Sequence, residues 1–146
     1  METKFLKKDF WLAISAGEIV AWLSLPTLKN LKILDALPEQ GISIQNFIIF
    51  WSFFVPFCAV SGLYLFYLIA KYKKRIGFFQ LGKYGVIGML NTFLNAGIFN
   101  LLIFITNISA GITVDLFFIA AFIVTVINSF IWNKYWSFAE KETETI

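Results

Sequence analysis

Four long apolar stretches dominate the chain, and short polar segments separate them. The stretches run over residues 10–28, 44–70, 84–106 and 112–131. Each provides the roughly 20 apolar residues that a helix needs to cross the hydrocarbon core of a bilayer. Because lipid offers no hydrogen-bond partners, the backbone of each stretch must satisfy its own polar groups, which favours helices over strands. The pattern therefore predicts an all-α, polytopic membrane protein with four transmembrane helices.

The polar segments between these stretches predict two antiparallel hairpins. The first hairpin spans residues 1–76, and the second spans residues 77–146 and ends in a short polar tail. The link over residues 107–111 is so short that the third and fourth helices must be antiparallel neighbours.

The longer link over residues 29–43 has a helical spacing of its own. Leu31, Leu34 and Leu37 recur every three residues before a proline and a glycine. A short interfacial helix and an ordered loop both fit this pattern.

The composition agrees with a membrane protein and excludes a soluble domain. Of the 146 residues, 59% are hydrophobic and only 14% are charged, and the mean hydropathy is +0.77. A soluble domain of this size could not bury so much apolar surface.

The cations are distributed unevenly between the two sides of the predicted helices. Ten of the 12 lysines and arginines lie in the two terminal segments and the central link, and only Lys29 and Lys32 lie on the other side. The positive-inside rule then places both termini in the cytoplasm. The net charge of +3 reflects this juxtamembrane distribution. We therefore expect the central link to rest on anionic headgroups and expect no nucleic acid partner.

Glu18 is the only acidic residue deep within an apolar stretch. Placing a charged carboxylate there costs roughly 2.5–3.5 kcal/mol or more, so it should be paired, hydrated or protonated. The asparagines of the third helix are candidate partners. A role in transport or coupling and a protonated structural role both remain open.

Small residues line the third helix at a spacing that favours close packing. Gly88, Thr92 and Ala96 repeat every four positions, and Gly85 precedes them. Such small residues let neighbouring helices approach closely in a membrane. We therefore predict a helix-packing role for Gly85, Gly88 and Ala96.

The same helix carries amides beside this row of small residues. Asn91 and Asn95 lie one turn apart, next to Thr92. They either form hydrogen bonds between helices or line a polar path for sugar hydroxyls or a phosphate.

Two lysines mark the cytoplasmic end of the second predicted hairpin. Lys83 begins the third helix and Lys134 follows the fourth, with Asn128 and Asn133 nearby in the sequence. Two ammonium groups and two amides at headgroup depth suit a phosphate. Snorkelling anchors are the alternative.

Trp132 and Trp136 lie four residues apart and should share a helix face. Anchoring in the aromatic belt is the usual role of such residues, and stacking on a sugar ring is the alternative.

Several kinds of catalytic centre are excluded by composition. The chain has no histidine, a single cysteine at Cys58 and no acidic pair or cysteine cluster to hold a catalytic metal. It also lacks a phosphate-binding glycine loop in the right context. We therefore predict neither cofactor nor enzyme activity for this chain alone.

Two motifs in the second hairpin resemble a known family. Residues 128–138, NSFIWNKYWSF, are similar to the N-F-x-x-N-R/K-x-W-x-F signature of GtrA-like membrane proteins. Residues 83–92, KYGVIGMLNT, are similar to the family's basic-aromatic-x-x-V-G-x-x-N-T opening. The first hairpin lacks an ending like the signature at residues 128–138. Either the first hairpin is a diverged repeat of the second, or the order of the two hairpins is exchanged relative to the family.

The resemblance implies a role with polyprenyl-phosphate-linked sugars in a bacterial-type inner membrane. It implies translocation, or help with translocation, during surface polysaccharide synthesis or glycosylation. It favours phosphate binding by Lys83, Lys134 and the neighbouring amides. The sugar would then follow a polar path formed by Glu18, Asn91, Thr92 and Asn95, together with Asn128. Because four helices form a thin wall, we expect a homodimer or a higher oligomer, together with a membrane glycosyltransferase as a candidate partner.

Two other functions compete with translocation. The chain could be a scaffold that anchors a glycosyltransferase and moves nothing. It could also be a small proton-coupled exporter that uses Glu18, because the small multidrug resistance family also has four helices and a glutamate in the first. The exporter interpretation leaves the motif at residues 128–138 without a role.

Overall fold

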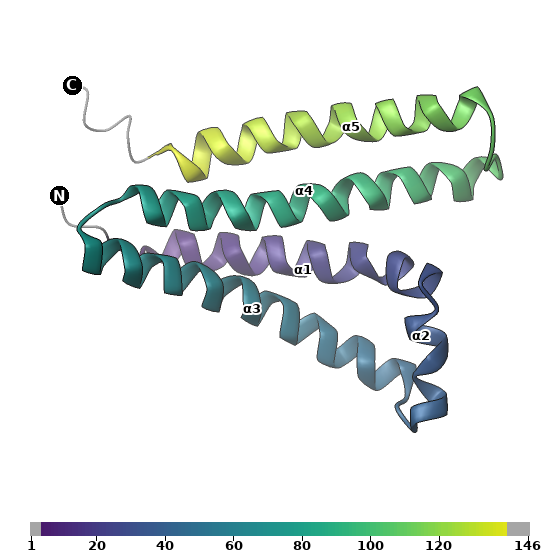
Figure 1. Cartoon of the computed structure of the whole chain (residues 1–146), viewed down its shortest axis with the longest axis horizontal. Coiled ribbons are helices and arrows are strands. Elements are labelled where there is room, and N and C mark those ends of the chain that lie inside the picture. The colour runs from purple at the N-terminus through teal and green to yellow at the C-terminus, as the bar shows by residue number, and fades with distance from the viewer. Residues whose placement is uncertain (1–3, 140–146) are drawn as a thin grey trace.

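The computed structural model describes residues 4–139, and the regular elements of this part of the chain are all helices (Figure 1). Its elements are α1 (Lys7–Asn30), α2 (Ile33–Ala36), the 3₁₀ turn η1 (Pro38–Gln40), α3 (Ile44–Lys73), α4 (Gly77–Thr106), α5 (Ile112–Trp132) and the π-helical turn η2 (Asn133–Ser137).

Four of these helices are long and apolar enough to cross a membrane, which confirms the predicted all-α fold with four spans. The spans are Lys7–Lys29, Ile44–Lys73, Gly77–Thr106 and Ile112–Ser137. They contain the predicted apolar stretches and extend beyond them, because polar residues at a helix end can continue the helix into the headgroup region.

The two ends of the bundle differ in what they carry (Figure 1). The start of α1 and the turn η2 lie at one end, beside the connection between α3 and α4. We call this the termini end. The opposite end carries α2 and the turn between α4 and α5. The cytoplasmic location of the termini stays a prediction from the cation distribution.

Helix α4 is the element that joins the bundle together. It packs against α1, α3 and α5, and α1 also packs against α3. Helix α5 lies along α4 on the outer side of the bundle (Figure 1). The second predicted hairpin therefore forms, and its first helix also contacts both helices of the first hairpin.

Small residues let α1 and α3 approach closely. A Cβ atom on Gly17 would lie 2.5 Å from the backbone Cα of Pro56, a distance that real Cβ atoms do not reach. Ala13 and Ala16 are fully buried on the same side of α1. Helix α1 contains Pro26 and continues past it to Asn30.

The link between α1 and α3 contains the short helix rather than only a loop. Leu34 and Leu37 are buried, which ties α2 and η1 to the bundle. Leu31 is exposed. The leucine spacing thus reflects two inward contacts and one outward side chain.

Candidate functional site: a buried charge cluster and a polar seam

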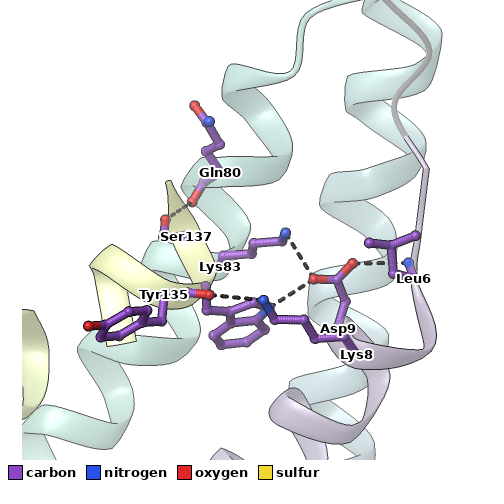
Figure 2. A network of polar contacts seen from close by, with 8 residues as sticks. Leu6, Lys8, Asp9, Gln80, Lys83, Tyr135 and Ser137 are labelled. Atoms are coloured by element: carbon purple, nitrogen blue, oxygen red, sulfur yellow. Dashed lines mark hydrogen bonds and ion pairs between the residues drawn. The ribbon is translucent and has the colours of Figure 1, made fainter. Parts of the chain in front are cut away.

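A buried ion pair lies at the termini end of the bundle (Figure 2). The ammonium nitrogen of Lys83 on α4 is 2.9 Å from Oδ1 of Asp9 on α1. The two side chains are only 2% and 1% exposed. A charge buried this deeply needs an opposite charge and further hydrogen bonds, because removal from water is costly.

Asp9 receives those further hydrogen bonds from two other segments. The indole N–H of Trp136 donates to Oδ1 over 2.8 Å, and the backbone N–H of Leu6 donates to Oδ2 over 3.0 Å. Asp9 lies in the first turn of α1, where a carboxylate also interacts favourably with the helix dipole. The carboxylate therefore joins the start of α1, the second turn of α4 and the turn after α5.

The π-helical turn η2 brings Trp136 into this cluster. The Phe138 N–H donates to the Asn133 carbonyl, five residues back, which is the hydrogen-bond pattern of a π turn. Trp136 is 2% exposed and meets Trp132 edge to face, with ring centroids 5.6 Å apart. Trp136 thus points into the bundle, and Trp132 is half-buried against the core.

A second set of contacts fastens η2 to its neighbours (Figure 2). The Lys8 ammonium donates to the Tyr135 carbonyl over 3.0 Å. The Ser137 hydroxyl donates to the Gln80 carbonyl over 3.3 Å. The buried Gln80 side-chain nitrogen has no hydrogen-bond partner among the described residues.

The two lysines predicted to share a phosphate occupy different environments. Lys83 is buried against Asp9, and its ammonium also lies 4.4 Å from the centroid of the Phe79 ring. Lys134 is exposed and lies beside the rings of Phe130 and Tyr135, at 5.9 and 5.6 Å. The geometry therefore leaves Lys134, rather than Lys83, open to a ligand from the membrane surface.

The amides of the second hairpin are split between two positions. Asn128 on α5 donates to the side-chain oxygen of Asn91 on α4 over 2.8 Å. Asn133 lies beyond the end of α5 and donates to the Ser129 hydroxyl over 3.3 Å. The side-chain oxygen of Asn133 is buried and has no hydrogen-bond partner within the described part of the chain.

We call the contact between α4 and α5 at Asn91 and Asn128 the polar seam. Asn95 lies one turn further along α4 and is half-buried. The Thr92 hydroxyl donates to the Gly88 carbonyl of its own helix. The seam thus contains one amide pair and a neighbouring amide whose side chain forms no hydrogen bond to residues 4–139.

Glu18 lies away from this seam. It shares a face of α1 with the exposed residues Trp11, Ser15 and Trp22, at spacings of three and four. Its half-buried carboxylate forms no ion pair or hydrogen bond to the described residues, so the expected pairing with the asparagines of the third helix does not occur.

The glycines that mediate close packing within the chain differ from those predicted. A Cβ atom on Gly85 or Gly88 would meet nothing within 4 Å. By contrast, a Cβ on Gly82 would lie 2.6 Å from Cβ of Phe66, and one on Gly97 would lie 2.6 Å from Cδ2 of Leu23. The predicted packing role of Gly85 and Gly88 is thus not fulfilled between helices of this chain, and Ala96 is half-buried.

Two cavities open between the helices. An apolar groove of about 380 Å³ lies between α1, α3 and α4, with Cys58, Gly62 and Gly85 in its wall. A larger cleft of about 740 Å³ lies between α1 and α4 at the opposite end, with Trp22 and Asn100 in its wall.

Within the described residues, no group of histidine, cysteine or acidic side chains is placed to hold a metal ion.

Asp9 is the central residue that the sequence analysis missed. It precedes the first apolar stretch among lysines, where an exposed carboxylate is the ordinary expectation. The available signal was its position directly before that stretch, which suits an acidic residue in the first turn of a helix.

One comparison with known proteins gives a match, and it covers the C-terminal part of the chain. Residues 83–146 match the family model of the GtrA/DPMS transmembrane domain. Neither the curated proteins nor the solved structures include a match to the chain. The match confirms the predicted resemblance to GtrA-like membrane proteins over residues 83–146. It indicates involvement in the translocation of lipid-linked sugars or in glycosylation.

Proposed function

We propose that the protein binds a polyprenyl-phosphate-linked sugar and moves it, or helps to move it, across the cell membrane. The process served would be surface polysaccharide synthesis or glycosylation. The observation that carries this proposal is the polar seam of Asn91 and Asn128, because it lies within the two helices that match the GtrA/DPMS transmembrane domain. Amides at this depth are costly in lipid and mark polar pathways.

The termini end is where the lipid phosphate would bind. Lys134 is exposed there, and the buried oxygen of Asn133 has no hydrogen-bond partner among the described residues. Lysine binds phosphate as a point charge. In this proposal Lys83 has a supporting role, because it holds Asp9 and thereby fixes Trp136 and the turn η2 that carries Lys134.

The sugar would pass along the polar seam while the prenyl chain stays in lipid. An amide pair can exchange its mutual hydrogen bond for two hydrogen bonds to sugar hydroxyls, so the exchange leaves no buried polar group unsatisfied. Asn95 and Thr92 extend the polar surface along α4 on the side toward the opposite end. This path consists of binding groups, and the proposal includes no catalytic step.

A vesicle flipping assay tests the proposal. Purified protein is reconstituted into liposomes that contain a fluorescent polyprenyl phosphosugar, and the lipid accessible to an external quencher is followed with time. Movement should be faster than in protein-free liposomes. It should slow at least several-fold with Asn128→Ala and with Lys134→Ala. The Asn46→Ala variant is a matched control, because Asn46 is exposed on α3 outside the seam. Unchanged movement in both test variants would refute the proposed path.

A second candidate function is a scaffold for a membrane glycosyltransferase. The observation that favours it is that these polar side chains already pair within the chain. Asn91 pairs with Asn128, and Lys83 pairs with Asp9. Gly88 is exposed with open space around it, so it offers a flat surface for a partner helix. Under this function, Gly88→Leu should abolish recovery of the glycosyltransferase, while Asn128→Ala should leave it unchanged.

A further inference from the structure

The cleft at the opposite end of the bundle has the chemistry of a binding site. It encloses about 740 Å³ between α1 and α4. Its polar wall comprises Lys29, Asn100, Asn107 and Ser109, and Trp22 contributes an aromatic wall. This mixture of a few polar groups and a large apolar surface is typical of small-molecule sites.

The amide of Asn100 has one group available for a ligand. Its side-chain nitrogen donates to the Ala96 carbonyl over 2.8 Å. Its side-chain oxygen accepts no hydrogen bond from the described residues. The hydrogen bond of the nitrogen fixes the orientation of this half-buried side chain, and it thereby also fixes the direction of the oxygen. The cleft therefore offers an oriented hydrogen-bond acceptor.

The ends of two helices make the cleft unfavourable for a phosphate. Helix α1 ends at Asn30 and helix α4 ends at Thr106, both beside the cleft. The last carbonyl groups of a helix lack intrahelical donors and carry partial negative charge. They repel an anion and accept hydrogen bonds from hydroxyl groups. The positive charge of Lys29, in the last turn of α1, already compensates the partial negative charge at the end of that helix.

An aromatic side chain in the cleft wall gives a surface suited to a sugar, and an acidic side chain lies just outside that wall. Trp22 is 58% exposed, so one face of its indole is open to stacking. Glu18 lies one turn before Trp22 on the same face of α1, and its carboxylate has no partner among residues 4–139. Carboxylates and amide oxygens accept hydrogen bonds from hydroxyls, and an aromatic face covers the C–H side of a sugar ring.

We propose that this cleft binds the uncharged sugar portion of the lipid-linked substrate at the end of the bundle opposite the termini. This inference rests on the proposed function and adds a second site to it. The phosphate would interact with Lys134 before movement, and the sugar would interact with Asn100 and Trp22 after it. The ligand class is a hydroxyl-rich sugar rather than a phosphate.

Binding measurements with two lipids separate this inference from the proposed function. The full chain is placed in nanodiscs, and affinities are measured for polyprenyl phosphate and for polyprenyl phosphoglucose. The wild type should bind the glucose-bearing lipid more tightly than the bare lipid. Asn100→Leu and Trp22→Leu should each weaken binding of the glucose-bearing lipid by roughly ten-fold, as the loss of one or two hydrogen bonds or a stacking surface predicts. Neither change should alter binding of the bare lipid.

Matched variants control for general effects on the fold. Asn46→Leu makes the same change on the exposed surface of α3, and Trp11→Leu removes an exposed tryptophan from the same face of α1. Both should bind as the wild type does. Equal wild-type affinity for the two lipids, or an equal loss of both lipids in Asn100→Leu and Trp22→Leu, would overturn the sugar site alone. A wild type that binds neither lipid would overturn the proposed function as well.

Discussion

The buried pair of Asp9 and Lys83 leads to a quantitative prediction about stability. In the Lys83→Met variant the ammonium group 2.9 Å from the carboxylate is replaced by an apolar side chain of similar length. Asp9 would remain buried as an anion with only the Trp136 and Leu6 donors. Removing one partner of a buried pair costs about 3–5 kcal/mol. The two remaining donors place the expected loss near the lower end, about 3 kcal/mol.

The double variant Asp9→Leu/Lys83→Met distinguishes an ion pair from simple packing. Replacing a whole buried pair by apolar residues is often nearly neutral, because the desolvation cost of both charges disappears. We therefore expect the double variant to be more stable than Lys83→Met alone. Trp136 loses its acceptor in the double variant, so a residual loss of about 1 kcal/mol should remain.

Unfolding in mixed micelles measures these differences. The free energy of unfolding is obtained by titration with SDS and followed by circular dichroism. Lys134→Met is the matched control, because this lysine is exposed near the same end and its loss should change stability by less than about 0.5 kcal/mol. The ion-pair interpretation fails if Lys83→Met is as stable as Lys134→Met. It also fails if the double variant loses as much stability as Asp9→Leu and Lys83→Met together lose as single changes.

Two further predictions concern the contacts between helices. Gly17→Ala should destabilise the protein by about 1–3 kcal/mol in the same titration, because the added Cβ meets the backbone of Pro56, which cannot move aside. Gly62→Ala should be nearly neutral, since nothing lies within 4 Å of its added Cβ, and equal effects of the two changes would contradict the packing argument. A double-mutant cycle with Asn91→Ala and Asn128→Ala should give a coupling energy of about 1 kcal/mol, the usual value for a hydrogen bond between membrane helices. Strict additivity in that cycle would mean that the amides do not pair in the membrane.

The fold could be predicted from the sequence because the decisive signal is local. A run of apolar residues specifies a membrane helix whatever it packs against, so the four spans were found without any knowledge of contacts. Pro26 does not interrupt this pattern, since α1 continues past it to Asn30. A proline close to the end of a helix removes few backbone hydrogen bonds, so it need not end the helix there.

The candidate site was only partly predictable because it depends on contacts between distant segments. Local sequence marked Lys83 and Trp136 as polar groups at a helix end, which suits snorkelling or a phosphate. It gave no sign that Asp9 would form an ion pair with Lys83 and accept a hydrogen bond from Trp136. These contacts exist only because α1, α4 and η2 meet in the fold. The structure therefore changes the role of Lys83 from a proposed ligand-binding group to part of the scaffold.

The glycines show the same limit. The regular spacing of Gly85 and Gly88 predicted a packing seam, but both lie on open surface in this chain. Gly17 and Gly97 had no comparable repeat, and each meets a neighbouring helix closely. Spacing identifies the face on which a residue lies, and only the arrangement of helices decides what that face meets.

Native mass spectrometry of gently solubilised protein asks directly whether this membrane protein carries a lipid-linked sugar. We expect a bound species whose mass equals that of a polyprenyl phosphate bearing a sugar, retained by the wild type and lost with Lys134→Ala and Asn128→Ala. The same spectrum reports whether the protein is the expected dimer. Retention of bulk phospholipid alone, identical in wild type and both variants, would rule out the proposed role as a carrier of lipid-linked sugar.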